Sequence, residues 1–195
     1  MDTLIQILAG LGLAASAGLN AWLPLLIVGL AARFTTLIHL SAPYNLLSNG
    51  WVLATLSVLL LIEILADKVP VVDSLNDAIH TFIRPAAGAI LFAAHNNALG
   101  DLNPVLALIL GLLAAGSVHA VKASVRPVLT ATTGGLANPI VSVIEDAVAI
   151  VSTLLALLVP ALSAVLFLIF LIVAVRLLFR WRQRHAARAD LQRAR

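Results

Sequence analysis

The chain has 195 residues, of which 62% are hydrophobic and only 11% carry a charge. Soluble domains are about 45–50% apolar and about 25% charged, so this composition excludes an ordinary soluble domain. The apolar residues lie in long blocks, such as 51–66 and 160–175, and about 20 such residues cross a bilayer as a helix. These blocks do not alternate in polarity as the strands of a membrane barrel do. The sequence therefore predicts an all-α integral membrane protein.

Charge is distributed unevenly along the chain. Residues 176–195 contain seven Arg and one Asp, whereas the preceding residues contain five basic and eight acidic ones. A basic tail beside an acidic body favours contact with anionic lipid headgroups rather than with nucleic acid. There is no cysteine, which excludes disulfides, thiolate metal sites and cysteine nucleophiles. We therefore divide the chain into a transmembrane helical bundle, 1–179, and a basic cytoplasmic tail, 180–195.

The first apolar segment, 3–33, is too long for one straight span. It contains Gly18, Asn20 and Pro24, residue types that break or kink membrane helices. The pattern leaves two structures open. One is a tilted, kinked helix, and the other is a discontinuous helix whose freed backbone groups line a site.

About six spans are expected in all. After a loop at 34–50, the second span covers 51–67, and a polar stretch follows. The third span covers 84–99, and a turn at 100–103 leads to the fourth span, 104–122. A second polar stretch, 123–139, precedes the fifth span, 139–159, for which Asn138 is the expected N-cap. The sixth span covers 160–179, so the apolar pattern and the breaks between its blocks account for the whole membrane body.

Lys and Arg residues indicate the orientation of these spans. With six spans, both termini are cytoplasmic, eleven of the twelve basic residues are on the cytoplasmic side, and only Arg33 lies outside. A five-span arrangement with the N-terminus outside also satisfies this count. The small size of the chain favours a homodimer.

Two helical hairpins, 51–99 and 104–159, contain similar segments near their polar connections. Residues 78–85, AIHTFIRP, align with residues 120–127, AVKASVRP. Short matches between apolar segments also arise by chance, so the sequence leaves open an internal two-fold repeat. In a true repeat, the site would lie at the interface between its halves.

Ionisable residues recur at helical spacing within this pattern. They are costly in a bilayer and usually face the bundle interior, a cavity or one another. One stripe, Asp73, Asp77, His80 and Arg84, predicts an amphipathic helix near the membrane interface. The candidates for substrate or ion binding are Glu63, Asp67, Lys68, Asp73, Asp77, His80, Arg84, His119, Lys122, Arg126, Glu145 and Asp146.

The simplest packing pairs these charges between hairpins. We expect the acids at 63 and 67 to meet Lys122 and Arg126. We expect Glu145 and Asp146 to meet Arg84 or Lys68. A structural belt of salt bridges is one interpretation of such a layer, and a polar cavity for an ion, a proton or a charged headgroup is the other. Buried ion pairs seldom stabilise more than apolar replacements would, which favours the cavity.

A stretch rich in glycine and threonine, 130–139, is a second candidate site. Glycines permit close backbone approach, and a helix N-terminus favours an anion. The candidate residues are Thr132, Thr133, Gly134, Gly135 and Asn138, with Lys122 and Arg126 just upstream. An ordinary re-entrant loop before a capped helix explains the same pattern.

No enzymatic motif is recognised, and we expect neither a metal site nor a cofactor. The pair Asp73 and Asp77 has the spacing found at the end of the metal motif of membrane alcohol phosphotransferases, but the upstream part of that motif is missing. The chain also has no HExxH, no GxSxG and no Ser/His/Asp order of a hydrolase.

Three segments carry a resemblance to a known family: residues 18–26, 63–89 and 126–146. Together they resemble an uncharacterised family of bacterial polytopic inner-membrane proteins, catalogued as a domain of unknown function (DUF4126-like). The resemblance covers about residues 5–175 and leaves out the basic tail. It implies a bacterial inner-membrane location and adds no chemistry.

The leading hypothesis is a small transporter or channel, or a lipid-headgroup translocator, with a charged site on the cytoplasmic side. Asp73, Asp77, His80 and Arg84 would gate the site or relay protons. Lys122, Arg126 and the 132–135 backbone would hold an anion, and the remaining acids would balance them. The alternative is a non-transporting membrane scaffold or assembly protein whose charge layer is structural.

Overall fold

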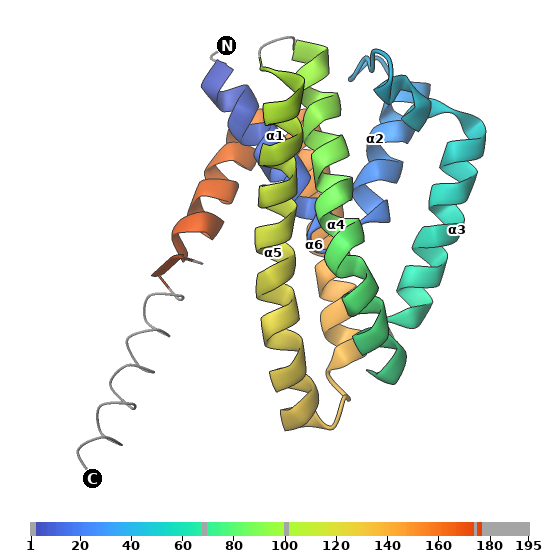
Figure 1. The fold of residues 1–195 in the computed structure, drawn as a ribbon, viewed down its shortest axis with the longest axis vertical. Helices are drawn as coiled ribbons and strands as arrows, with labels where there is room; N and C mark the ends of the chain where they lie inside the picture. Colours follow the sequence, from blue (N-terminus) through green and yellow to red (C-terminus); the bar gives the residue numbers. More distant parts are fainter. Residues whose placement is uncertain (1–2, 68–69, 100–101, 174, 177–195) are drawn as a thin grey trace.

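A computed structural model describes residues 3–67, 70–99, 102–173 and 175–176, and the described residues form helices without any strand (Figure 1). Side chains at 70–75 and 97–99 are not described. In chain order the helices are α1 (Thr3–Ala17), α2 (Trp22–Phe34), the 3₁₀ helix η1 (Tyr44–Ser48), α3 (Gly50–Ala66), α4 (Pro70–Leu99), α5 (Pro104–Thr133) and α6 (Asn138–Leu158). A further helix covers Pro160–Val173. The prediction of an all-α chain is therefore confirmed.

The first apolar segment forms two helices, α1 and α2, separated by a break at residues 18–21. Gly18 lies in this break, where the backbone of α5 comes close. A Cβ at position 18 would lie 2.4 Å from the Ala115 carbonyl oxygen of α5, so a larger residue would not fit without a shift. Pro24 is not at the break. It is the third residue of α2, a position whose N–H has no partner within the helix, so the missing N–H costs little.

Helices α4 and α5 are longer than the sequence predicted, because both polar stretches are largely helical. The stripe that contains Asp77 and Arg84 continues directly into the third predicted span, so it is not a separate interfacial helix. The second stretch, 123–139, is helical up to Thr133, and only residues 134–137 connect α5 to α6. Pro85 and Pro127 lie inside α4 and α5 without ending them.

Asn138 does not have the capping role predicted for it. Helix α6 begins at Asn138 itself, its N-cap is Ala137, and no side chain caps it. The Asn138 side chain instead bonds to Thr130 near the end of α5. The tight turn between α5 and α6 explains the difference, because Gly134 and Gly135 have positive φ values of 62° and 84° and end α5.

Helices α4 and α5 form the centre of the bundle, with α1 packed against both of them (Figure 1). Gly88 and Gly111 bring α4 and α5 together, because a Cβ on Gly111 would lie 2.3 Å from the Gly88 carbonyl oxygen. Small residues permit this backbone approach, as they do between membrane helices. Helix α6 packs against α1 and α2, while α3 lies on the outside next to α2. The close crossing fixes the height at which polar residues of α4 face those of α5.

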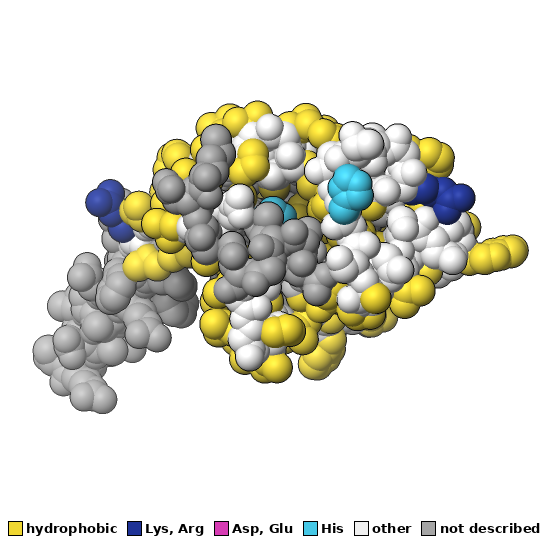
Figure 2. All heavy atoms as spheres, turned by 90° about the horizontal axis from the view of Figure 1, so that it is seen from above, with side chains coloured by type: hydrophobic (Ala, Val, Ile, Leu, Met, Phe, Trp, Pro, Cys, Tyr) yellow, Lys and Arg dark blue, Asp and Glu magenta, His cyan; other side chains and the backbone are white. Residues whose placement is uncertain are grey.

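Two helices of the described residues, α5 and α6, are long and apolar enough to cross a membrane, and the other apolar helices are shorter. Large apolar side chains are nevertheless exposed around the bundle, among them Trp51, Phe82, Leu136 and Ile140. Figure 2 shows the end of the molecule at the top of Figure 1, where hydrophobic side chains surround much of the rim and no acidic side chain is visible. The acidic side chains that the structure describes are buried or partly buried: Glu63, Asp67, Asp77, Glu145 and Asp146.

Candidate functional site

Ten ionisable side chains from four helices and one helix end meet near one end of the bundle, in the lower half of Figure 1. We call them the ionic cluster: Glu63, Asp67, Asp77, His80, Arg84, His119, Lys122, Arg126, Glu145 and Asp146. Seven of them are buried. The end of α3, the first half of α4, the second half of α5 and the start of α6 supply them. Buried charges need partners, and the cluster provides most of these partners itself.

Arg84 is fully buried and connects three elements. Its Nη2 donates to Glu63 Oε1 of α3 at 3.0 Å, and its Nη1 donates to Asp77 Oδ1, two turns earlier on α4, at 3.0 Å. His80 Nδ1 lies 2.9 Å from the same Glu63 oxygen, away from the ideal hydrogen-bond direction. The His80 ring meets the Trp22 ring edge-on, with 6.1 Å between the centroids. Removing this guanidinium would leave two carboxylates without their main cation.

His119 must be neutral in this arrangement, and its tautomer follows from its partners. The Arg84 guanidinium can only donate, so the His119 Nδ1 at 3.0 Å from it accepts. The proton is therefore on Nε2, which donates to the Thr81 hydroxyl at 3.1 Å. The Thr81 hydroxyl in turn donates to the Asp77 backbone carbonyl oxygen. This chain of hydrogen bonds orients His119 between α4 and α5.

Lys122 and Arg126 of α5 form a second group of ion pairs. Both contact Glu145 Oε2 of α6, the lysine at 2.9 Å. Both also lie near Asp67 Oδ2, at 3.9 Å and 3.8 Å. Asp67 is held in place by Asn76, which donates to it at 2.8 Å. The two α5 cations therefore tie α5 to α6 and to the end of α3.

The break in the first helix contributes directly to the cluster. The carbonyl oxygen of Leu19 accepts a hydrogen bond from Lys122 Nζ at 3.1 Å. Asn20 is buried, and its Oδ1 accepts from the backbone N–H groups of Trp22 and Leu23 at the start of α2. Its Nδ2 donates to Asp146 Oδ1 at 2.9 Å. Backbone and amide groups freed by the break thus line the site, as the discontinuous-helix interpretation predicted.

Carboxylates outnumber basic side chains in the cluster by five to three. Asp146 has the Asn20 amide as its hydrogen-bond partner and forms no ion pair among the described residues. Glu63 Oε2 is buried and has no hydrogen-bond partner among the described residues. Counting the Asp, Glu, Lys and Arg side chains alone, the described cluster carries an excess of negative charge. Uncompensated charge is costly in a low-dielectric interior, so the arrangement favours uptake of a cation or a proton.

The predicted pairing between hairpins holds for some residues and is exchanged for others. Asp67 approaches Lys122 and Arg126 as predicted. Glu63 contacts Arg84 instead, and Glu145 contacts the α5 cations rather than Arg84. The exchange follows from the long α4, which places Arg84 at the level of Glu63. Two candidates, Lys68 and the Asp73 side chain, lie outside the described residues.

Among the described residues, no hydrogen bond or ion pair joins the side chain of Thr132 or Thr133 to the ionic cluster. Thr132 and Thr133 are helical, and their hydroxyls donate to carbonyl oxygens of their own helix. A Cβ built on Gly134 has open space around it. Lys122 and Arg126, the predicted anion ligands, already contact Glu145. An anion at these two side chains must therefore take the place of a carboxylate.

Sequence reasoning missed several polar groups that support the cluster: Leu19, Trp22, Asn76, Thr81 and Ser142. Ser142 is buried and donates weakly to Asp67, at 3.4 Å. Asn76 and Thr81 lie within the recognised polar stretch. Their helical spacing was the available signal, since Asn76 is one turn before His80 and Thr81 is one turn from both Asp77 and Arg84. The carbonyl of Leu19 leaves no sequence signal of its own. The described residues contain no group of His, Asp and Glu side chains placed to hold a metal ion.

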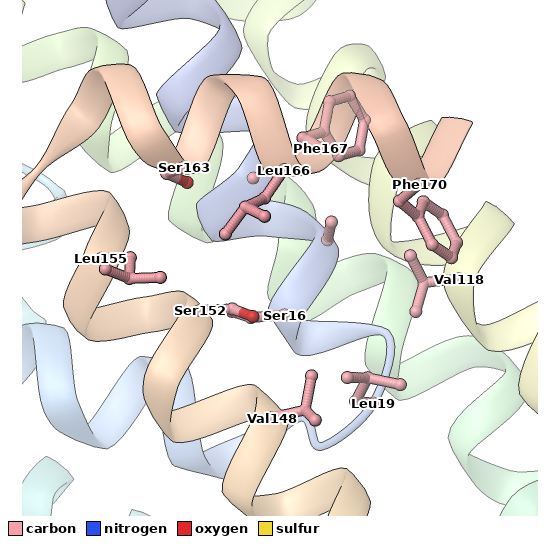
Figure 3. A pocket seen from close by; sticks show the side chains of 12 residues that line it. Ser16, Leu19, Val118, Val148, Ser152, Leu155, Ser163, Leu166, Phe167 and Phe170 are labelled. Atoms are coloured by element: carbon pink, nitrogen blue, oxygen red, sulfur yellow. The ribbon is translucent and has the colours of Figure 1, made fainter. Parts of the chain in front are cut away.

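An apolar groove runs along the outside of the bundle toward the cluster. It encloses about 390 Å³ and is lined by side chains of α1, α5, α6 and the helix Pro160–Val173, with Ser16, Ser152 and Ser163 as its polar groups (Figure 3). A second cavity of about 220 Å³ lies between α5 and α6. Leu19, Val118 and Phe170 line both spaces. Lys122, Arg126 and Glu145 line the second one, so the groove adjoins the ionic cluster.

Comparisons with known proteins give one match. No curated protein and no solved structure matches the chain. A family model described as a domain of unknown function, DUF4126, matches residues 7–180. This range contains every helix from α2 to α6, nearly all of α1 and the whole ionic cluster. The chain therefore belongs to the DUF4126 family.

Proposed function

We propose that this chain is a small multi-spanning membrane transporter whose ionic cluster binds the transported or coupling cation, the simplest of which is a proton. The observation that carries the proposal is the excess of carboxylates, and above all Asp146, which has an amide rather than a base as its partner. Buried carboxylates without a counter-ion are characteristic of proton and ion pathways in membranes.

Membrane insertion is supported by the exterior of the bundle. Helices α5 and α6 meet the length and hydropathy needed to cross a bilayer, and apolar side chains are exposed along both of them, among them Val128, Ile144 and Val151. The proposal includes six spans, a bacterial inner-membrane location and cytoplasmic termini. The excess of Lys and Arg on one side supports the orientation. Contact of the arginine-rich tail with anionic lipid and formation of a homodimer stay predictions.

The break between α1 and α2 provides a route by which proton binding at Asp146 is coupled to the packing of the helices. Asn20 caps α2 and also bonds to Asp146. A bond to an ionised carboxylate is about twice as strong as a neutral one. Uptake of a proton by Asp146 therefore weakens the link between α6 and the broken helix. Broken helices whose freed groups line a binding site are a recurrent feature of transporters.

A proton-flux experiment tests this proposal. The full chain is reconstituted into liposomes of phosphatidylethanolamine and phosphatidylglycerol with an entrapped pH-sensitive dye, and a pH gradient is imposed. We expect the wild type to dissipate the gradient faster than empty liposomes and Asp146→Asn to be as slow as empty liposomes. Asp190→Asn in the tail is the matched control and should behave as wild type. A wild type that is no faster than empty liposomes would overturn the transporter proposal.

The second candidate function is a non-transporting scaffold, which the mutual pairing of most cluster members favours. In that case Arg84→Gln and Arg126→Gln would each unfold the protein in detergent, and no variant would alter proton flux. Folding is followed by thermal unfolding of the purified protein, and the same liposome assay follows flux. The two candidates therefore predict different results for Asp146→Asn, which removes a charge without removing a partner of any base.

A further inference from the structure

The groove has the shape and lining of a site for a lipid chain. Its walls are apolar, and the exposed side chains of Val148 and Leu166 stand at its edge, so it can be entered from the outer surface of the bundle. Phe167 and Phe170 of the helix Pro160–Val173 form one wall (Figure 3). Gly12 permits this helix to approach α1, because a Cβ there would meet Ser163 Oγ at 2.4 Å.

The second cavity, which adjoins the groove at Leu19 and Val118, has charged groups of both signs in its lining. Lys122, Arg126 and Glu145 line it together with apolar side chains. The two cations share one Glu145 oxygen. An apolar space that ends at charged groups is complementary to an amphiphile rather than to a small hydrophilic solute.

The charges of Lys122, Arg126 and Glu145 determine which lipid headgroup fits this cavity. A phosphate would fit the donors of Lys122 and Arg126, since both residues bind phosphate oxygens. A purely anionic headgroup would bring the phosphate into a cluster with excess carboxylates and leave Glu145 unpaired. A headgroup with an additional ammonium supplies Glu145 with a replacement cation. A primary ammonium suits a buried carboxylate better than a quaternary one, because it has N–H donors.

From these observations we infer that the groove binds a phospholipid with a zwitterionic amino headgroup, of the phosphatidylethanolamine class. An acyl chain lies between α1, α6 and the helix Pro160–Val173. The phosphate contacts Lys122 and Arg126, and the ammonium contacts Glu145. This inference rests on the proposed transporter function and adds the chemical class of its ligand. Binding itself is independent of proton movement, so it can be tested separately.

The test uses native mass spectrometry of the full chain in detergent. Phosphatidylethanolamine, phosphatidylcholine and phosphatidylglycerol with identical acyl chains are titrated separately. We expect phosphatidylethanolamine to bind about tenfold more tightly than the other two, the difference that one charge-assisted hydrogen bond supplies. Glu145→Gln should reduce the affinity for phosphatidylethanolamine to that for phosphatidylcholine.

A pair of neighbouring substitutions on α6 locates the site. Ser152→Phe places a ring in the groove and should abolish the preferred binding. Val151→Phe is the control, because Val151 is 54% exposed and is not part of the groove lining. Equal retention of the three lipids, a preference for phosphatidylglycerol, or wild-type binding by Ser152→Phe would each overturn the inference. Because no proton flux is measured, a failure here is distinct from a failure of the transporter proposal.

Discussion

Asn20 and Asp146 are 126 residues apart in the sequence, and their side chains are joined by a 2.9 Å hydrogen bond at the break in the first helix. The same amide side chain accepts from two backbone N–H groups of α2. One residue therefore ends the break, begins the next helix and holds the carboxylate that has no ion pair among the described residues.

The first prediction concerns this double role. Asn20→Ala should destabilise the protein by about 2–4 kcal/mol, because a lost cap costs about 1 kcal/mol and a lost hydrogen bond to a charged group costs about 1.5–3 kcal/mol. The measurement is equilibrium unfolding in detergent. Asn103→Ala is the matched control, since Asn103 caps α5 at an exposed position and contacts only backbone N–H groups. Equal losses in the two variants would contradict the structural role given to Asp146.

The second prediction concerns the crossing of α4 and α5. A methyl group at Gly88 would lie 2.3 Å from Ala115 Cβ and 2.8 Å from the Gly111 carbonyl oxygen. Gly88→Ala should therefore push the helices apart and destabilise the protein by about 1–3 kcal/mol. Gly116→Ala provides the comparison, because its methyl group would meet Pro85 at an ordinary 3.7 Å.

Thermal unfolding of the two glycine variants gives the readout. Gly116→Ala should leave the free energy of unfolding unchanged or raise it by up to about 1 kcal/mol, since alanine is a better helix former than glycine. If Gly88→Ala were as stable as Gly116→Ala, the close contact between α4 and α5 would be wrong. The ionic cluster depends on that contact, because it sets the height of Arg84 against His119.

The third prediction concerns the state of His119. Its Nδ1 accepts from Arg84 and its Nε2 donates to Thr81, so we expect a neutral ring with the proton on Nε2. Nitrogen-15 NMR of protein labelled at histidine distinguishes the two ring nitrogens. Thr81→Val removes the acceptor of Nε2 and should shift that resonance, at a cost in stability of about 1 kcal/mol or less.

His95 serves as an internal control for this measurement. Its Nε2 lies 3.2 Å from the Gln6 carbonyl oxygen, far from Thr81 in the sequence, so its resonances should be the same in both proteins. A protonated His119, or a proton on Nδ1, would contradict the hydrogen-bond chain between α4 and α5.

Much of the architecture could be predicted from the apolar blocks. The break near Gly18 and Asn20 was recognisable because small, polar residues interrupt a long apolar run. The boundary at Asn103 and Pro104 was also recognisable, because an N-cap followed by proline is a local signal. The lengths of α4 and α5 could not be predicted from the sequence. The polar residues in the first half of α4 predicted a separate helix at the membrane interface, whereas in the structure they continue into the apolar segment as one helix.

The members of the ionic cluster could be identified from their chemical type, whereas their partners could not. Helical spacing shows that Asp77 and Arg84 share a face, and the structure confirms their contact. Which acid meets Lys122 depends on how α5 is rotated and raised relative to α6, and this follows from side-chain packing over the whole helix. The carbonyl of Leu19 is beyond sequence reasoning, since every residue has one.

Pro85 and Pro127 each directly follow an arginine of the ionic cluster. Proline has no N–H, so the carbonyls of Thr81 and Ala123, four residues earlier, receive no helical hydrogen bond from these positions. Each long helix can bend there without giving up a bond that it has already lost. Bending at either proline would therefore change the angle between the two halves of the helix next to an arginine of the ionic cluster.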